Sequence, residues 1–237
     1  MSQHDLASAA GTDSDTELSG LRCLLFDAAI KDQLTAIDRL AALGDRGIAL
    51  LQEFCLHDNG PGGGKAHQVL CAVASPAIRA FLSEKLPQGV VPPITQGAID
   101  YQPVIDALVA RDYQYADRLT LQALCQLVGP DTSKRQWLYF TEVENLPVAD
   151  LRTLDRLWIA YSEGKFGFSV QQQLWLSVGQ NFEKLWPRIG WKQENVWTRY
   201  PDEFVWDTSA PRGHLPLSNQ LRGVRPFAAL MAHPAWE

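Results

Sequence analysis

Arg222 and Arg225 are the residues near the C-terminus best suited to bind an anion. They lie in the stretch GHLPLSNQLRGVRPF, residues 213–227, which contains no acidic residue that could pair with them. Guanidinium groups bind carboxylates through paired, charge-assisted hydrogen bonds. Because proline disfavours a helical conformation in the residue before it, Pro226 predicts that Arg225, like Arg222, lies in a loop or at its exit. The two arginines therefore indicate binding of carboxylates that belong to another molecule.

Aromatic side chains crowd the segment just before these arginines. Residues 189–225 keep no stable period and contain three prolines, and so long a loop in a compact domain is usually functional. Its aromatic residues are Trp191, Trp197, Tyr200, Phe204 and Trp206. Such walls bury flat apolar surfaces, so the segment suits a porphyrin with two propionates or another amphipathic acid. The alternative is that the tryptophans are core residues and the arginines are exposed to solvent.

Metal-dependent and nucleophilic chemistry are not indicated. None of the five histidines pairs with another histidine or a cysteine at ligand spacing, and no G-x-S-x-G motif occurs. The stretch GPGGGK, residues 60–65, lacks the Ser or Thr that follows the lysine of a phosphate-binding loop, so a flexible turn is predicted. His214 is the one candidate for an axial ligand of a porphyrin metal, but its position beside Gly213 favours a hydrogen bond within a turn.

The remaining charged residues and the cysteines have ordinary structural interpretations. Solvated positions on helix faces are expected for Asp112, Asp117, Asp150, Asp155 and Glu163. Small, buried, apolar roles are expected for Cys23, Cys55, Cys71 and Cys125. The net charge of −6 argues against a general nucleic-acid binder, and no apolar run reaches the roughly 18 residues of a membrane span.

The first half of the chain is predicted to be a set of short amphipathic helices. Apolar residues recur at three- and four-residue spacing over 18–30, 31–44 and 46–58, and further helices are expected over 65–74 and from Pro76 onward. Short helices joined by tight turns suggest a small helical bundle or an armadillo-like stack over 19–86. The polar, acidic residues 1–18 are expected to form a frayed N-terminus.

A composition change separates this half from the rest. All eight tryptophans lie at or beyond Trp137, and the proline-rich residues 87–97 predict a linker before a core domain over 98–237. Helices are predicted there over 101–112, 113–129, 147–164, 168–179 and from Pro226, with Ser169 and Gln172 as a capping box. Core positions are expected for Trp158 and Trp175, while FGF, residues 166–168, suits either the core or a ligand contact. The predicted fold class is therefore all-α.

Two long motifs resemble those of a known family. WIAYSEGKFGFSVQQQLW, residues 158–175, resembles the central signature of the Genomes-Uncoupled-Four family, and PRGHLPLSNQLRGVRPF, residues 211–227, resembles its C-terminal loop. The resemblance covers 96–237, and the first half is similar to the extra domain of cyanobacterial members. It implies a helical core shaped like a cupped hand that binds protoporphyrin IX and magnesium protoporphyrin IX. It also implies a non-catalytic regulator that stimulates magnesium chelatase, together with the chelatase H subunit, in chlorophyll biosynthesis.

The resemblance also assigns site residues. The polar binding positions fall on Asn219, Arg222 and Arg225. The expected apolar walls are Trp197, Tyr200, Phe204, Trp206, Leu215, Leu217 and Leu221. We expect no obligatory cofactor, no metal site and a monomer in the cyanobacterial cytoplasm, since no transit peptide is present; association with the periphery of membranes stays open. The alternative function is a helical protein–protein adaptor that does not depend on porphyrin.

Overall fold

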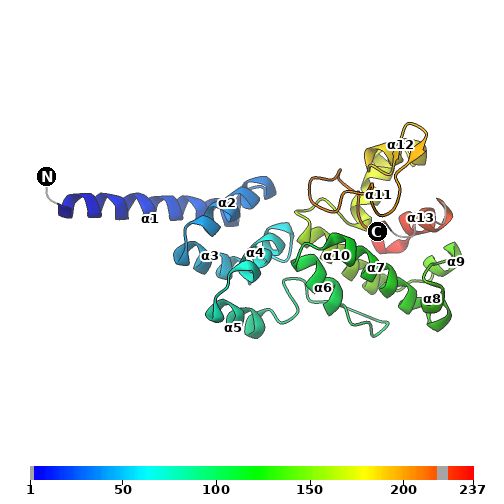
Figure 1. Ribbon diagram of the computed structural model, residues 1–237, viewed down its shortest axis with the longest axis horizontal. Helices are drawn as coiled ribbons and strands as arrows, with labels where there is room; N and C mark the ends of the chain where they lie inside the picture. The colour runs from blue at the N-terminus through cyan, green and yellow to red at the C-terminus, as the bar shows by residue number, and fades with distance from the viewer. Residues whose placement is uncertain (1–2, 218–223) are drawn as a thin grey trace. The chain divides into compact units, whose positions relative to one another are not determined.

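The computed structural model describes the backbone of residues 3–217 and 224–237, and the side chains from residue 15 onward within those ranges. The chain divides into two compact units, Met1–Val90 and Val91–Glu237. Both units are built from helices, as Figure 1 shows, which confirms the all-α prediction. Within the described ranges, no helix is long and apolar enough to cross a membrane.

The first unit is a stack of five helices. They are α1 (Gln3–Asp27), α2 (Ile30–Ala42), α3 (Asp45–Cys55), α4 (Pro61–Ala72) and α5 (Pro76–Lys85). Successive helices pack on one another, and α2 also packs on α4. Their buried apolar faces supply the core residues Leu21, Leu25, Ile37, Leu40, Leu51 and Leu70. The three- and four-residue spacing of these leucines and isoleucines therefore produced the packing faces that the sequence predicted.

The N-terminal residues differ from the prediction of a frayed segment over 1–18, because α1 already begins at Gln3. The C-terminal part of α1 is tied to two other helices. Asp15 pairs with Arg46 of α3, and Glu17 pairs with Arg39 of α2 at 2.6 Å. Once such contacts hold one part of a helix, each added residue gains a hydrogen bond without a new nucleation cost. Helix formation can then continue toward the N-terminus.

The glycine-rich stretch is not the flexible turn that was predicted, because α4 begins at Pro61 and includes the glycines. The Asp58 carboxylate accepts hydrogen bonds from the Gly60 N–H at 2.6 Å and the Gly63 N–H at 3.1 Å, which satisfies donors at the start of the helix. A Cβ atom on Gly63 would lie 1.9 Å from the Asp58 carbonyl oxygen. Glycine is therefore required there by close packing of the backbone and not by flexibility.

The lysine of this stretch, which resembled the lysine of a phosphate-binding loop, also has a structural role. The buried Lys65 places its Nζ 2.6 Å from a carboxylate oxygen of Asp38, so the two residues form a structural ion pair.

The prediction of four buried cysteines is half right. Cys55 and Cys125 are buried, whereas Cys23 and Cys71 are exposed. In the part of the chain that the structure describes, no group of three or more His, Cys, Asp or Glu side chains could hold a metal ion.

The second unit contains a larger set of helices, which range from 4 residues in α9 to 16 residues in α7. They are α6 (Gln102–Val109), α7 (Tyr113–Val128), α8 (Pro130–Arg135), α9 (Phe140–Val143), α10 (Val148–Tyr161), α11 (Phe168–Ser177), α12 (Phe182–Arg188), α13 (Val224–Met231) and the 3-10 turn Pro234–Trp236. A small antiparallel hairpin pairs β1 (Lys192–Gln193) with β2 (Val196–Trp197). Figure 1 shows α6, α7 and α10 packed together. It also shows α13 beside α9, although α10, α11 and α12 separate the two helices in sequence.

Aromatic residues fill the centre of this unit. Trp158 is fully buried and stacks on Tyr113 at 6.1 Å between ring centroids, and its indole N–H donates to the Thr120 hydroxyl at 3.0 Å. Phe166 and Phe168 are also fully buried. The core interpretation of Trp158 is thus confirmed, and the two phenylalanines have no surface to offer a ligand.

Three acidic residues expected on solvated faces are buried instead. Asp117, Asp150 and Asp155 each accept hydrogen bonds from other segments, which is what permits burial of a carboxylate. Asp150 of α10, for example, accepts from the Tyr101 hydroxyl and the Gln96 N–H, both at 2.8 Å. The helical period placed these residues correctly on polar faces, but those faces meet other polar groups and not water.

The start of α11 also differs from prediction. The helix α11 begins at Phe168 with Gly167 as its N-cap, so Ser169 lies inside the helix and does not form the predicted capping box. The backbone N–H of Ser169 donates instead to the Asp155 carboxylate at 2.8 Å. A carboxylate from a neighbouring helix therefore replaces the local cap that the sequence suggested.

Candidate functional site

The C-terminal stretch that carries the predicted polar site is described only in part. Asn219, Leu221 and Arg222 lie outside the described residues. Arg225 is described, and it lies in the first turn of α13, at the exit from the predicted loop and not in the middle of a helix. Pro226 is compatible with that turn because the first N–H groups of a helix have no intrahelical partner.

The side chain of Arg225 is exposed and lies over an aromatic ring. Its Cζ atom is 5.8 Å from the ring centroid of Phe140, the first residue of α9. Phe140, Tyr139 and Val224 are 38%, 49% and 41% exposed, so the ring beneath the cation and the apolar sequence neighbours of Phe140 and Arg225 are all open to solvent. We call these four residues the α9 patch. The aromatic part of this patch was not predicted, although the run WLYF at 137–140 is a visible signal in the sequence.

The predicted apolar walls fall into exposed and buried groups. Trp197 and Tyr200 are exposed on 41% and 36% of their surface, and Trp206 is half-buried, so these three are accessible to a ligand. Phe204, Leu215 and Leu217 are buried, at 5%, 0% and 4% exposure. These three side chains are core residues, which corrects their assignment to an open binding face.

The accessible aromatic residues belong to two different clusters. Tyr200, Phe204 and Trp206 contact one another, with ring centroids 6.0 to 6.4 Å apart. Trp197 packs instead against Trp186 of α12 at 5.6 Å. The structure therefore does not join all four predicted aromatic residues into one wall.

The cluster that holds Trp197 also reaches the helix that carries Arg225. Trp186 stacks on Trp191 with centroids 5.7 Å apart and planes within 5°. Phe227 of α13 packs against both tryptophans, at 5.3 Å and 5.2 Å. Because Phe227 is two residues beyond Arg225, a continuous set of packed rings supports both the exposed Trp197 and the exposed guanidinium.

His214 is held inside the protein by both ring nitrogens. Its Nδ1 lies 2.7 Å from the Ile189 carbonyl oxygen, to which it donates, and its Nε2 accepts from the Val205 N–H at 3.2 Å. Burial lowers the pKa of the imidazole, although the hydrogen bond to Ile189 acts in the opposite direction. Both nitrogens of the neutral ring thus make hydrogen bonds within the protein, as expected for a structural residue. Neither nitrogen is open to a porphyrin metal.

The backbone that leads into the Asn219–Arg222 stretch is fixed by two buried side chains. Gln171 of α11 donates from its amide nitrogen to the carbonyl oxygens of Gly213, at 3.0 Å, and Pro216, at 2.8 Å. The Leu217 N–H donates to the Asp117 carboxylate at 2.7 Å. Burial raises the pKa of Asp117 to about 7, although this hydrogen bond opposes the shift. Residues 213–217, which precede that stretch in sequence, are therefore anchored to α7 and α11.

Comparison with known proteins identifies two family matches. A GUN4-like model matches residues 95–234, and a model described as an ARM-like repeat domain, GUN4-N terminal, matches residues 9–87. The second match confirms the armadillo-like interpretation of the first half. The Ycf53-like protein of Synechocystis sp. is 48% identical over 231 residues, which cover 95% of this chain and 97% of that protein. The tetrapyrrole-binding protein, chloroplastic, of Arabidopsis thaliana is 36% identical over 138 residues, covering 54% and 52%.

Solved structures agree with these matches. GUN4 from Chlamydomonas reinhardtii is 41% identical, with a TM-score of 0.58 over 62% of this chain and 96% of that one. The ligand-free structure of Arabidopsis thaliana GUN4 is 35% identical, with a TM-score of 0.54 over 59% and 99%. The fold similarity thus accounts for nearly the whole of both solved chains.

Proposed function

This chain belongs to the GUN4 family, and we propose that it is a non-catalytic protein that binds tetrapyrroles and stimulates magnesium chelatase in chlorophyll biosynthesis. The proposed ligands are protoporphyrin IX and magnesium protoporphyrin IX, and the proposed partner is the chelatase H subunit. The name of the Arabidopsis relative, a tetrapyrrole-binding protein, supports the ligand class. Family resemblance supports the remaining parts, including a monomer in the cyanobacterial cytoplasm that can associate with the periphery of membranes.

The observation that carries the proposal is the surroundings of Arg225. Its guanidinium is exposed beside Phe140, and none of the ion pairs among the described side chains includes it. An exposed arginine next to exposed rings offers a propionate a charged partner and the macrocycle an apolar surface. The α9 patch and Trp197 provide both kinds of surface within the second unit.

The energetics favour reversible binding. An exposed arginine–carboxylate pair contributes about 1 kcal/mol or less, because water and salt screen it. Burial of the flat macrocycle contributes more, at about 25 cal/mol per Å² of apolar surface. Binding that depends mainly on ring burial at an open face can be reversed, as transfer of the ligand to a chelatase subunit requires.

Titration with deuteroporphyrin IX, a soluble porphyrin with two propionates, tests the proposal. We expect the full-length protein to shift the Soret band and to quench tryptophan fluorescence. Arg225→Ala should weaken binding about fivefold, the factor that corresponds to about 1 kcal/mol. Arg225→Lys should lose less, because the ammonium keeps the charge but not the paired geometry.

Arg46→Ala provides the matched control, because Arg46 is an exposed arginine of the first unit. This variant should bind deuteroporphyrin as the unmodified protein does. A Soret band that saturating protein leaves unchanged would reject tetrapyrrole binding. Capture of the chelatase H subunit that is equal with and without porphyrin would instead favour the adaptor alternative.

A further inference from the structure

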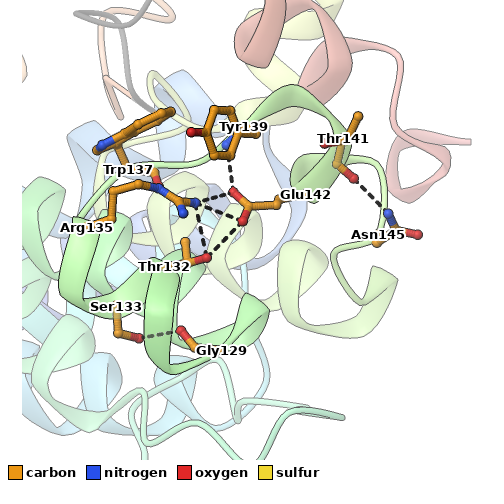
Figure 2. A network of polar contacts seen from close by, with 9 residues as sticks. All are labelled: Gly129, Thr132, Ser133, Arg135, Trp137, Tyr139, Thr141, Glu142 and Asn145. Carbon is orange, nitrogen blue, oxygen red and sulfur yellow. Dashed lines mark hydrogen bonds and ion pairs between the residues drawn. The ribbon is translucent and has the colours of Figure 1, made fainter.

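The connection between α8 and α9 is closed by an ion pair between Arg135 and Glu142. One guanidinium nitrogen, Nη2, lies 2.8 Å and 2.6 Å from the two carboxylate oxygens, as Figure 2 shows. The two side chains are only 24% and 22% exposed. Partial removal from water strengthens a charge-assisted contact relative to the half-exposed pairs of the first unit.

Glu142 also ties the two helices together through groups other than Arg135. Its carboxylate accepts from the backbone N–H of Tyr139, the N-cap of α9, at 2.7 Å. It also accepts from the Thr132 hydroxyl of α8 at 3.0 Å (Figure 2). Burial raises the pKa of Glu142, but the hydrogen bonds from Tyr139 and Arg135 outweigh burial and leave the pKa below its usual value. The carboxylate is therefore ionised when it joins the end of α8 to the start of α9.

Arg135 organises the aromatic residues of the same connection. Its Cζ atom lies 4.6 Å from the ring centroid of Trp137 and 4.5 Å from that of Tyr139, and the two ring centroids are 4.4 Å apart. Its Nε donates to the Trp137 carbonyl oxygen at 3.1 Å. Gln136, which lies between Arg135 and Trp137 in the sequence, adopts a left-handed conformation with φ of 61°. The turn thus wraps around the guanidinium, and the orientation of both rings depends on it.

The position of α9 requires this support. α9 is four residues long, and so short a helix is not stable by itself in water. Apart from the network around Arg135, α9 is held by its packing against α13. Phe140 and Tyr139 are the exposed rings at the start of α9, and Phe140 is the ring beneath Arg225. A shift of α9 would therefore separate the apolar part of the α9 patch from its cation.

We propose that Arg135 and Glu142 are positioning residues of the tetrapyrrole site, which hold α9 so that Phe140 and Tyr139 face the ligand beside Arg225. This inference rests on the proposed function. Neither Arg135 nor Glu142 needs to touch the ligand, because both act through the geometry of α9. Arg135 and Glu142 differ in this respect from Arg225, whose guanidinium is exposed and would itself pair with a carboxylate of the ligand.

Arg135→Met and Arg135→Lys in the full-length chain test the proposal. Methionine keeps much of the apolar stem but loses all five donors, so we expect its dissociation constant for deuteroporphyrin IX to rise about tenfold. Lysine can still pair with Glu142 but cannot also donate through a planar Nε to Trp137, so a smaller loss is expected. In wild type, Thr132 and Tyr139 donate to different oxygens of Glu142. Glu142→Gln keeps one acceptor oxygen, replaces the other with an NH2 donor and removes the charge, so it should also weaken binding.

A double-mutant cycle distinguishes positioning from general destabilisation. If Arg135 holds Phe140 against Arg225, then Arg225→Ala should cost clearly less in the Arg135→Met background than in the unmodified protein. Arg22→Met is the matched control, because Arg22 makes a similar two-oxygen pair with Glu53 in the first unit, at 2.5 Å and 2.6 Å. It should leave the dissociation constant unchanged.

The outcomes separate this inference from the proposed function. If the unmodified chain does not bind deuteroporphyrin, the proposed function fails. If it binds, and folded Arg135→Met binds equally well or its effect adds fully to that of Arg225→Ala, only the positioning role is overturned. Circular dichroism reports folding, and if Arg135→Met does not fold, unchanged binding by folded Arg135→Lys and Glu142→Gln would overturn the role.

Discussion

At the scale of single residues, Asp117 is a buried carboxyl group with a raised pKa. It is buried on α7, and the Leu217 N–H that leads toward the Asn219–Arg222 stretch donates to it. Burial raises its pKa from 3.8 to about 7. A raised pKa means that the folded protein binds this proton more tightly than the unfolded chain. Its favourable contribution is therefore full below about pH 4 and is lost as the pH rises through 7.

The variant Asp117→Asn should remove this pH dependence. Asparagine can still accept the Leu217 N–H but cannot ionise. Relative to the variant, the unmodified protein should gain about 2 kcal/mol in free energy of unfolding between pH 8 and pH 5. Urea unfolding of both proteins at the two pH values measures the difference. If the difference in free energy of unfolding between the two proteins were the same at pH 5 and pH 8, the result would contradict the burial of an ionisable Asp117.

At the scale of elements, the start of α4 shows how packing overrides local preference. Helix propensity alone predicts that alanine at position 63 would be more stable than glycine by up to about 1 kcal/mol. The structure predicts the opposite sign. A Cβ atom at Gly63 would lie 1.9 Å from the Asp58 carbonyl oxygen, which is backbone and cannot move aside by a rotamer change.

We therefore expect Gly63→Ala to lower the free energy of unfolding by about 1–3 kcal/mol through overpacking. Gly20→Ala is the matched control, because nothing lies within 4 Å of a Cβ atom at that position in α1. The control should be neutral or stabilising, as propensity predicts. Thermal unfolding of both variants checks the pair, and a stabilised Gly63→Ala would show that the glycine-rich turn is flexible after all.

At the scale of the whole molecule, each unit has its own buried core. The residues of the candidate site that the structure describes, including Arg225, Phe140 and Trp197, all lie in Val91–Glu237. A chain of residues 91–237 should therefore fold by itself and bind deuteroporphyrin within about twofold of the full-length affinity, since its contacts to ligand would be unchanged. Circular dichroism and the same porphyrin titration measure both properties. A folded fragment with tenfold weaker binding would instead assign part of the site to the first unit.

Much of the architecture could be predicted from the sequence. The spacing of leucine and alanine predicted the helices because a helical period is local, and the division near residues 87–97 followed from prolines that cannot continue a helix. The arginine–aromatic composition of the last segment also suits a flat anionic ligand. Exposed Arg225, Trp197 and Tyr200 agree with that interpretation.

Tertiary structure alone decided which of these residues meet one another. A helical period marks a face but not its partner, so Asp117 was predicted to be solvated and is buried against a distant loop. For the same reason Leu215 became a core residue and Phe140, far away in sequence, became the ring beneath Arg225. The sequence by itself determined the helices and predicted the kind of ligand, because both inferences depend on residue types and local spacing. The surface that carries this chemistry depends on contacts between remote segments, which only the folded chain brings together.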